Sequence, residues 1–335
     1  KEYTAYYLRV LDRSLDLALD ILSDIFWSPA FRPAELEAER QVILEEVLMR
    51  ADEPADLVHD VFAAALFPDH PIGRDVLGTE ATVTAVSRSD VARFHEDHYR
   101  PGNVVFAAAG QLDHEAIVEG VARRFDGGAG GGPPARRAPV AAPTPLAVTE
   151  RPTEQVHVVV GMRGLDRDDP DRYALAVLNQ VLGGGMSSRL FQTIREERGL
   201  VYSVFSYRAG FQDAGALAVY AGTMPSRAEE VLQLIHAELD RLVTDGVTPR
   251  ELEVAKGHLQ GELALSLEDS AARMNRIGRS QLVHGTVHTV DEVASWIGDV
   301  TLEDTARVAE RILTNPRVLA VVGPVDDRAL ATRVA

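Results

Sequence analysis

Residues 33–40 read PAELEAER and residues 249–256 read PRELEVAK, so one helical pattern occurs twice, 216 residues apart. The offset stays nearly constant beyond this stretch, and the further matches are Ile43 with Leu259, Glu46 with Glu262, and residues 90–93 (DVAR) with 304–307 (DTAR). Matches spread over two long segments indicate two homologous domains in tandem rather than one recurring helix.

The second copy opens with a segment, residues 155–214, that has no counterpart in the first copy. The chain also begins with Lys1 rather than methionine. We therefore expect a first domain at residues 1–126 that lacks its own beginning, a linker at 127–148 and a second domain at 149–335. The linker is predicted from a run rich in glycine and then in proline, a composition typical of flexible and then extended chain.

Hydrophobic periodicity predicts more helices than strands. In the first copy, the expected helices are 14–26, 34–50, 55–66 and 89–98, and one short buried strand is expected at 104–109. In the second copy, the expected strands are 156–162, 201–207 and 216–221, and the expected helices are 227–243, 249–267 and 302–313. A short polar turn between two of these strands favours antiparallel pairing. The predicted fold class is α+β: two homologous αβ domains in tandem, each an antiparallel sheet covered by helices, with the first truncated at its N-terminus.

Charge and composition narrow the classes of function. The formal net charge is −17, which argues against nucleic acid or an anionic membrane as partner, because phosphate binding needs clustered Lys and Arg. With no cysteine, the chain has no disulfide, thiolate nucleophile or thiolate metal ligand. Any metal would need His and carboxylate ligands. We expect a cytoplasmic protein.

The predicted helix at 34–50 carries two acidic residues that share a face. Glu39 and Glu46 lie seven residues apart, close to two helical turns, so both carboxylates project from the same side. Such a pair can supply one metal ligand and one supporting carboxylate. The common alternative is a solvated acidic face.

Four dispersed stretches carry a family resemblance. They are ERQVILEE at 39–46, HPIGRDVLGT at 70–79, HYRPGN at 98–103 and REERGLVYSV at 195–204. Together, and in this order, they resemble the pitrilysin/insulinase family of zinc metallopeptidases, the inverzincins with an H-x-x-E-H motif, and particularly its processing-peptidase-like members. The resemblance covers nearly the whole chain and implies the processing-peptidase-like fold.

The resemblance implies roles for the acidic pair. Glu46 becomes the third zinc ligand and Glu39 a supporting carboxylate, while the two histidine ligands and the general-base glutamate are expected upstream of Lys1. No H-x-x-E-H occurs in this sequence, so this chain alone is not expected to hold zinc. The second domain, where Glu262 matches Glu46 but no histidine stands at the motif position, is expected to be a degenerate copy without a metal site.

The same resemblance assigns Arg195 and Tyr202 to the substrate. A guanidinium and a phenol can both donate hydrogen bonds to a developing oxyanion. The alternative is an arginine that ends a helix and a tyrosine that starts a strand. The facing zinc site would belong to another chain.

Other chemical groups are interpreted as structural. His95 and His98, in the sequence HEDH, have the wrong spacing for the zinc motif, and they are expected to cap or pack, as are His59 and His70. The run Gly183–Gly185 lacks the lysine of a phosphate-binding loop, so we expect a turn.

The implied function is that of a zinc-dependent metalloendopeptidase subunit. It would hydrolyse peptide bonds of unfolded peptides or presequences in an enclosed chamber, as a homodimer or as a heterodimer with a homologous subunit. The alternative is a non-catalytic homologue that serves as a structural or substrate-presenting partner subunit.

Overall fold

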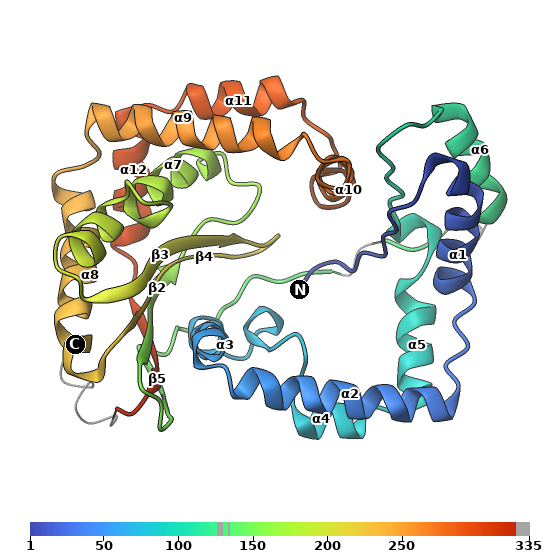
Figure 1. The fold of residues 1–335 in the computed structure, drawn as a ribbon, viewed down its shortest axis with the longest axis horizontal. Helices are drawn as coiled ribbons and strands as arrows, with labels where there is room; N and C mark the ends of the chain where they lie inside the picture. The colour runs from blue at the N-terminus through green and yellow to red at the C-terminus, as the bar shows by residue number, and fades with distance from the viewer. Residues whose placement is uncertain (126–129, 133–134, 326–335) are drawn as a thin grey trace. The chain divides into compact units, whose positions relative to one another are not determined.

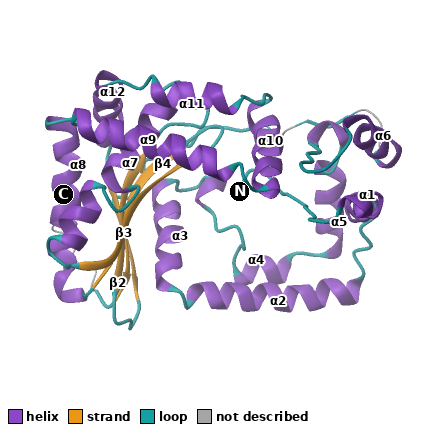
Figure 2. Ribbon diagram, turned by 45° about the horizontal axis from the view of Figure 1, so that its top comes forward, coloured by secondary structure: helices purple, strands orange, loops and turns teal. Residues whose placement is uncertain are grey.

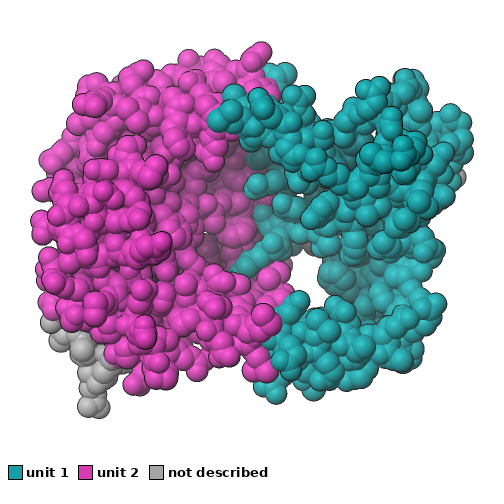
Figure 3. All heavy atoms as spheres, in the orientation of Figure 1, with its two compact units in different colours: residues 1–46, 78–135, 263–289 teal, residues 47–77, 136–262, 290–335 magenta. Residues whose placement is uncertain are grey.

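The computed structural model describes residues 1–125, 130–132 and 135–325. The chain divides into two compact units (Figure 3). The ranges of unit 1 are 1–46, 78–135 and 263–289, and those of unit 2 are 47–77, 136–262 and 290–335. The division cuts two long helices at equivalent positions of the repeat, after Glu46 in one and after Glu262 in the other.

Helices dominate the described chain, and all of its strands gather in one group (Figures 1 and 2). The helices are α1 (Leu15–Trp27), α2 (Pro33–Ala51), α3 (Pro54–Leu66), α4 (Glu80–Ala85), α5 (Arg88–His98), α6 (His114–Arg124), α7 (Arg172–Gly183), α8 (Ala228–Thr244), α9 (Pro249–Ser266), α10 (Ser270–His284), α11 (Val290–Gly298) and α12 (Leu302–Leu313). The strands are β1 (Leu146–Glu150), β2 (Val156–Arg163), β3 (Val201–Gly210), β4 (Gly215–Thr223) and β5 (Val318–Gly323).

Unit 2 is built on a five-stranded sheet in the order β1-β5-β2-β4-β3. Strand β2 pairs antiparallel with both β4 and β5, and β3 pairs antiparallel with β4. Only β1 runs parallel to its neighbour, β5. Strand β3 therefore lies at one edge of the sheet.

Alternation along the strands gives the sheet two apolar faces. On β2, Val158 and Val160 belong to one buried cluster, whereas Val159 belongs to another. This is the two-residue period of a strand that is covered on both sides. The first face packs against α7, α8, α9 and α12, whose buried side chains share that cluster. The second face is covered by α3 (Figure 1).

Helix α3 approaches the sheet closely at a glycine. Phe62 is buried against β2, and a Cβ atom added to Gly161 would lie 2.5 Å from its ring. A larger residue at this strand position would push the helix away. By the repeat, α3 corresponds to α10, and the two helices fall in opposite units, α3 in unit 2 and α10 in unit 1.

The described residues of unit 1 form helices and loops but no strand, and the prediction of a strand at 104–109 is wrong. Residues 104–109 are half-buried, and they pair with no strand among the described residues. Their repeat counterpart, β5, lies between β1 and β2, while this sequence contains no second copy of β2. A strand forms only where its backbone groups find a neighbour, so apolar character alone did not suffice here.

The remaining predicted helices and strands are confirmed, with ends that differ by at most three residues. The α+β class is confirmed as well. Strand β1 begins at Leu146, inside the segment predicted as linker, and residues 127–129 and 133–134 of that segment lie outside the described residues. Nowhere in the described chain does a helix combine the length and apolar character needed to cross a membrane.

Candidate functional site

A π-helix positions Arg195 in unit 2. Residues Phe191–Glu196 form this helix, and its inner side is held by Leu190 and Ile194, both completely buried. The Arg195 guanidinium carbon lies 4.6 Å from the centroid of the Phe191 ring and 5.5 Å from that of Tyr202. The structure thus brings together the two residues that the sequence assigned to the substrate. π-helical turns are rare and occur frequently at functional sites.

A second irregularity places Tyr202. The pairing of β3 with β4 skips one residue between Val201 and Ser203, so Tyr202 stands at a β-bulge. Bulges re-aim a side chain and are common beside active sites. The side chain is 81% exposed although the residue belongs to a strand of the sheet.

Arg195 and Tyr202 are free to act on a ligand. Within the described part of the chain, no carboxylate pairs with the Arg195 guanidinium and no group hydrogen-bonds the Tyr202 hydroxyl. The ring faces of Phe191 and Tyr202 hold the cation by cation–π attraction, which leaves its N–H groups available. Such donors suit a peptide carbonyl or an oxyanion that develops from it.

Glu39 and Glu46 both lie exposed on α2. No described residue bonds to either carboxylate, in contrast to Glu37, which accepts hydrogen bonds from Arg40 and Gln41. Those bonds, first that from Arg40, hold the pKa of Glu37 below its usual value. Glu37 therefore bonds within α2, whereas Glu39 and Glu46 have no partner among the described residues.

The described residues by themselves do not complete a zinc site. A zinc ion needs at least three protein ligands, and no group of three His, Asp or Glu side chains with suitable geometry is present among them. Glu46 belongs to no such group in the part of the chain that the structure describes. The equivalent Glu262 on α9 is likewise exposed.

The histidines interpreted as structural make structural contacts. Nε2 of His95 lies 2.8 Å from the Phe26 carbonyl, and the His98 ring packs 4.5 Å from that of Phe94. His70 Nε2 bonds a linker carbonyl at 2.7 Å. These contacts agree with packing and capping roles.

The glycine run also serves packing. A Cβ atom on Gly183 would lie 2.5 Å from the backbone nitrogen of Ser206, and one on Gly184 would lie 2.3 Å from the side chain of Gln180. Gly183 excludes a side chain because α7 ends directly against β3, whereas a side chain at Gly184 would collide with Gln180 of α7 itself. A phosphate-binding role is not needed to explain the run.

Sequence reasoning missed a histidine–tyrosine cluster under α3. His59 Nδ1 lies 2.8 Å from the Tyr207 hydroxyl, and His157 Nδ1 lies 2.9 Å from that of Tyr220. The rings of His59, Tyr220 and Phe205 stack between helix and sheet. Burial lowers the pKa of both imidazoles and raises the pKa of Tyr207. No pattern of spacing could reveal this cluster, since its members come from four separate elements.

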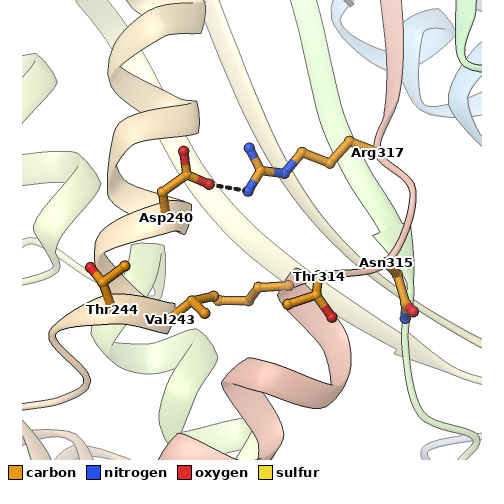
Figure 4. Close-up of a pocket in the computed structure, with 7 residues that line it drawn as sticks. Asp240, Val243, Thr244, Thr314, Asn315 and Arg317 are labelled. Carbon is orange, nitrogen blue, oxygen red and sulfur yellow. Dashed lines mark hydrogen bonds and ion pairs between the residues drawn. The ribbon is translucent and has the colours of Figure 1, made fainter. Parts of the chain in front are cut away.

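A surface cavity of about 370 Å³ lies where α8 and α12 end, and Figure 4 shows its lining. Its residues are Asp240, Val243, Thr244, Leu313, Thr314, Asn315 and Arg317. The one cation of the lining, Arg317, is already bonded to Asp240 and to His236. The cavity offers no unpaired nucleophile or base, so it does not compete with Arg195 and Tyr202 as the candidate site.

Family models match most of the chain. Residues 1–80 match the insulinase model, peptidase family M16, and residues 85–259 match the model described as the peptidase M16 inactive domain. The label of the second match agrees with a copy that lacks its own metal site.

Relatives and solved structures agree with these matches. An uncharacterized zinc protease of Streptomyces coelicolor is 45% identical over 98% of this chain and 73% of its own length. The uncharacterized zinc protease YmxG of Bacillus subtilis is 36% identical over 97% of this chain and 79% of its own length.

The crystal structure of a peptidase M16 inactive domain from Pseudomonas fluorescens covers 94% of this chain with a TM-score of 0.85, at 23% identity over 76% of its own chain. A protease from Helicobacter pylori covers 93% with a TM-score of 0.84, at 22% identity over 77% of its own chain. At these identities the two structures confirm the fold. The relatives and family models confirm the predicted resemblance, and the chain belongs to the insulinase family of peptidases, family M16.

Proposed function

We propose that this chain is a subunit of a zinc-dependent metalloendopeptidase and that unit 2 binds the substrate peptide through Arg195 and Tyr202. The observation that carries the proposal is the placement of these two donors: half-buried Arg195 on a π-helix and exposed Tyr202 at a β-bulge are in contact, and neither has a polar partner among the described residues. Arg195 is half-buried, and no described residue forms an ion pair with it. Here the guanidinium is held by ring faces alone.

The neighbouring edge of the sheet suits an extended peptide. Strand β3 pairs with β4 on one side, and no other described strand pairs with its second side. A peptide added there would gain backbone hydrogen bonds, and its carbonyls would pass close to the start of β3, where Tyr202 lies. Strand addition requires an extended chain, so the substrates would be unfolded peptides or presequences rather than folded proteins.

The metal-site part of the proposal rests on the family resemblance and on the free carboxylates of α2. Glu46 would supply one zinc ligand and Glu39 would support it. The described residues supply no further ligand. Peptide cleavage would take place in an enclosed chamber formed with a homologous subunit, identical or not.

Peptide binding tests the role of unit 2. The probe is a fluorescein-labelled, unfolded β-casein peptide, and fluorescence anisotropy gives its Kd with the natural full-length gene product. Arg195→Ala should raise the Kd by about tenfold, and Tyr202→Phe, which keeps the ring, by less. Arg198→Ala is the matched control, because Arg198 is exposed on the same segment and faces Glu230. Unchanged affinity in both site variants would refute the proposed role.

A second candidate function is that of a non-catalytic partner subunit. It is favoured by the match of residues 85–259 to an inactive-domain model and by the incomplete ligand set in the described residues. Zinc content separates the two candidates. A peptidase subunit binds about one zinc ion per chain in the natural gene product, and a purely structural partner binds none.

A further inference from the structure

Residues 189–196, which include Arg195, are anchored at their first residue by a bidentate ion pair. Arg189 Nε and Nη2 donate to the two carboxylate oxygens of Glu251 at 2.6 and 2.8 Å. Nη2 also donates to the Gly246 carbonyl at 2.8 Å, in the turn between α8 and α9. Both side chains are largely buried, with 16% of Arg189 and 28% of Glu251 exposed.

The carboxylate is itself fixed in place. Glu251 accepts a hydrogen bond from the backbone N–H of Thr248 at 2.8 Å, at the start of α9. The bond from Arg189 is the main reason that its pKa falls to about 2, so the pair stays ionised at neutral pH. The anchor therefore joins three elements: the helical segment that begins at Arg189, the α8–α9 turn and α9.

The repeat shows that this use of the carboxylate is specific to the second copy. The equivalent residue of the first copy is Glu35, which bonds only its near neighbour Arg32, at 2.8 Å on the exposed surface. In the second copy, Glu251 instead reaches an arginine 62 residues away in the sequence. Capping of α9 needs only the bond from the Thr248 N–H to Glu251 and does not require Arg189.

We propose that Arg189 and Glu251 are positioning residues that set the orientation of Arg195 and Tyr202 toward the substrate. The proposal rests on the proposed substrate role of that pair. Leu190 and Ile194 hold the segment by apolar contact, which is not directional. A bidentate arginine–carboxylate pair fixes direction as well as distance. It thus limits rotation of the segment about its own axis, and that rotation would carry the Arg195 guanidinium away from Tyr202.

The test compares Arg189→Lys with Arg311→Lys in the natural full-length gene product. Arg311 makes the same kind of bidentate pair, with buried Asp169, but on α12. The first readout is amide hydrogen exchange in residues 190–203. We expect faster exchange there with Arg189→Lys and with Glu251→Gln, and no change with Arg311→Lys. Equal exchange in all the proteins would overturn the anchoring.

The second readout is the Kd of the labelled β-casein peptide in a double-mutant cycle. Arg189→Lys alone should raise the Kd about fivefold, and it should add nothing once Arg195→Ala is present, because it acts through Arg195. Additive effects would overturn the positioning role. If Arg195→Ala leaves the Kd unchanged, the substrate role of Arg195 and Tyr202 is refuted. The positioning role of Arg189 and Glu251 is then refuted as well, even if amide hydrogen exchange in residues 190–203 is faster in Arg189→Lys.

Discussion

His59 Nδ1 on α3 and the Tyr207 hydroxyl on β3 lie 2.8 Å apart, and their hydrogen bond joins the helix to the sheet in unit 2. Burial is the main reason that the pKa of His59 is lowered, with Asp56 and Asp60 opposing the shift. A tyrosine that keeps its proton donates to a neutral imidazole. Burial favours the neutral imidazole, whose Nδ1 can accept this proton.

We predict that acid weakens unit 2 through this histidine. Because the pKa is lower in the folded state, the unfolded state binds more protons below an ordinary imidazole pKa of about 6.5. The stabilisation is complete above that pH and is lost progressively as the pH falls from there through the lower pKa of the folded state. His59→Gln should therefore flatten the dependence of Tm on pH between about 5 and about 7. His114→Gln, at an exposed position of α6, is the control, and an unchanged slope with His59→Gln would refute the prediction.

The packing of α3 gives a second prediction. Phe62 is 3% exposed and fills the space left by Gly161, so Phe62→Ala opens a cavity between helix and sheet. The change should lower the free energy of unfolding by about 3–5 kcal/mol, measured by urea denaturation. Leu48→Ala, at a position that is 56% exposed, should cost no more than about 0.5 kcal/mol. Equal losses would mean that α3 is not part of the core.

A third prediction concerns residues 136–145, the stretch of chain that leads into β1. The guanidinium of Arg163 donates to the carbonyls of Pro139 and Ala141 in this stretch and to that of Leu66 at the end of α3. Arg163→Met removes all of these donors, so trypsin should cleave near Arg137 at least about threefold faster.

The control for this experiment is Arg151→Met at an exposed position. An unchanged rate with Arg163→Met would show that other contacts hold the stretch. The hydrogen bond from the Thr144 N–H to the Ala65 carbonyl would then be the next to examine.

The sequence predicted the longest helices and the antiparallel strands β2, β3 and β4, and it missed α7 and α10. Helix α7 is largely buried, and its polar residues are few: Arg172, Asn179 and Gln180. Helix α10 has no buried residue and a glycine, Gly278, in its interior. The strand expected at 104–109 failed because strand formation depends on a neighbour, which its own residues cannot report.

The candidate site was predictable in part. The family motifs identified Arg195 and Tyr202, and the structure places them in contact. The π-helix and the bulge that present them are set by tertiary packing, and the partnership of Arg189 with Glu251 joins residues 62 positions apart, so neither could be predicted from spacing. The role of Glu46 as a metal ligand remains a prediction.

The most direct measurement is zinc content together with cleavage of the labelled β-casein peptide, made on the natural full-length gene product and on its Glu46→Gln and Glu45→Gln variants. Glu45 is the matched control, since it is the exposed neighbour of Glu46 on the same helix but projects from a different face. The account predicts about one zinc ion per chain and peptide cleavage in the wild type and in Glu45→Gln, with both lost in Glu46→Gln. Zinc and cleavage retained in Glu46→Gln, or absent from the wild type, would contradict it.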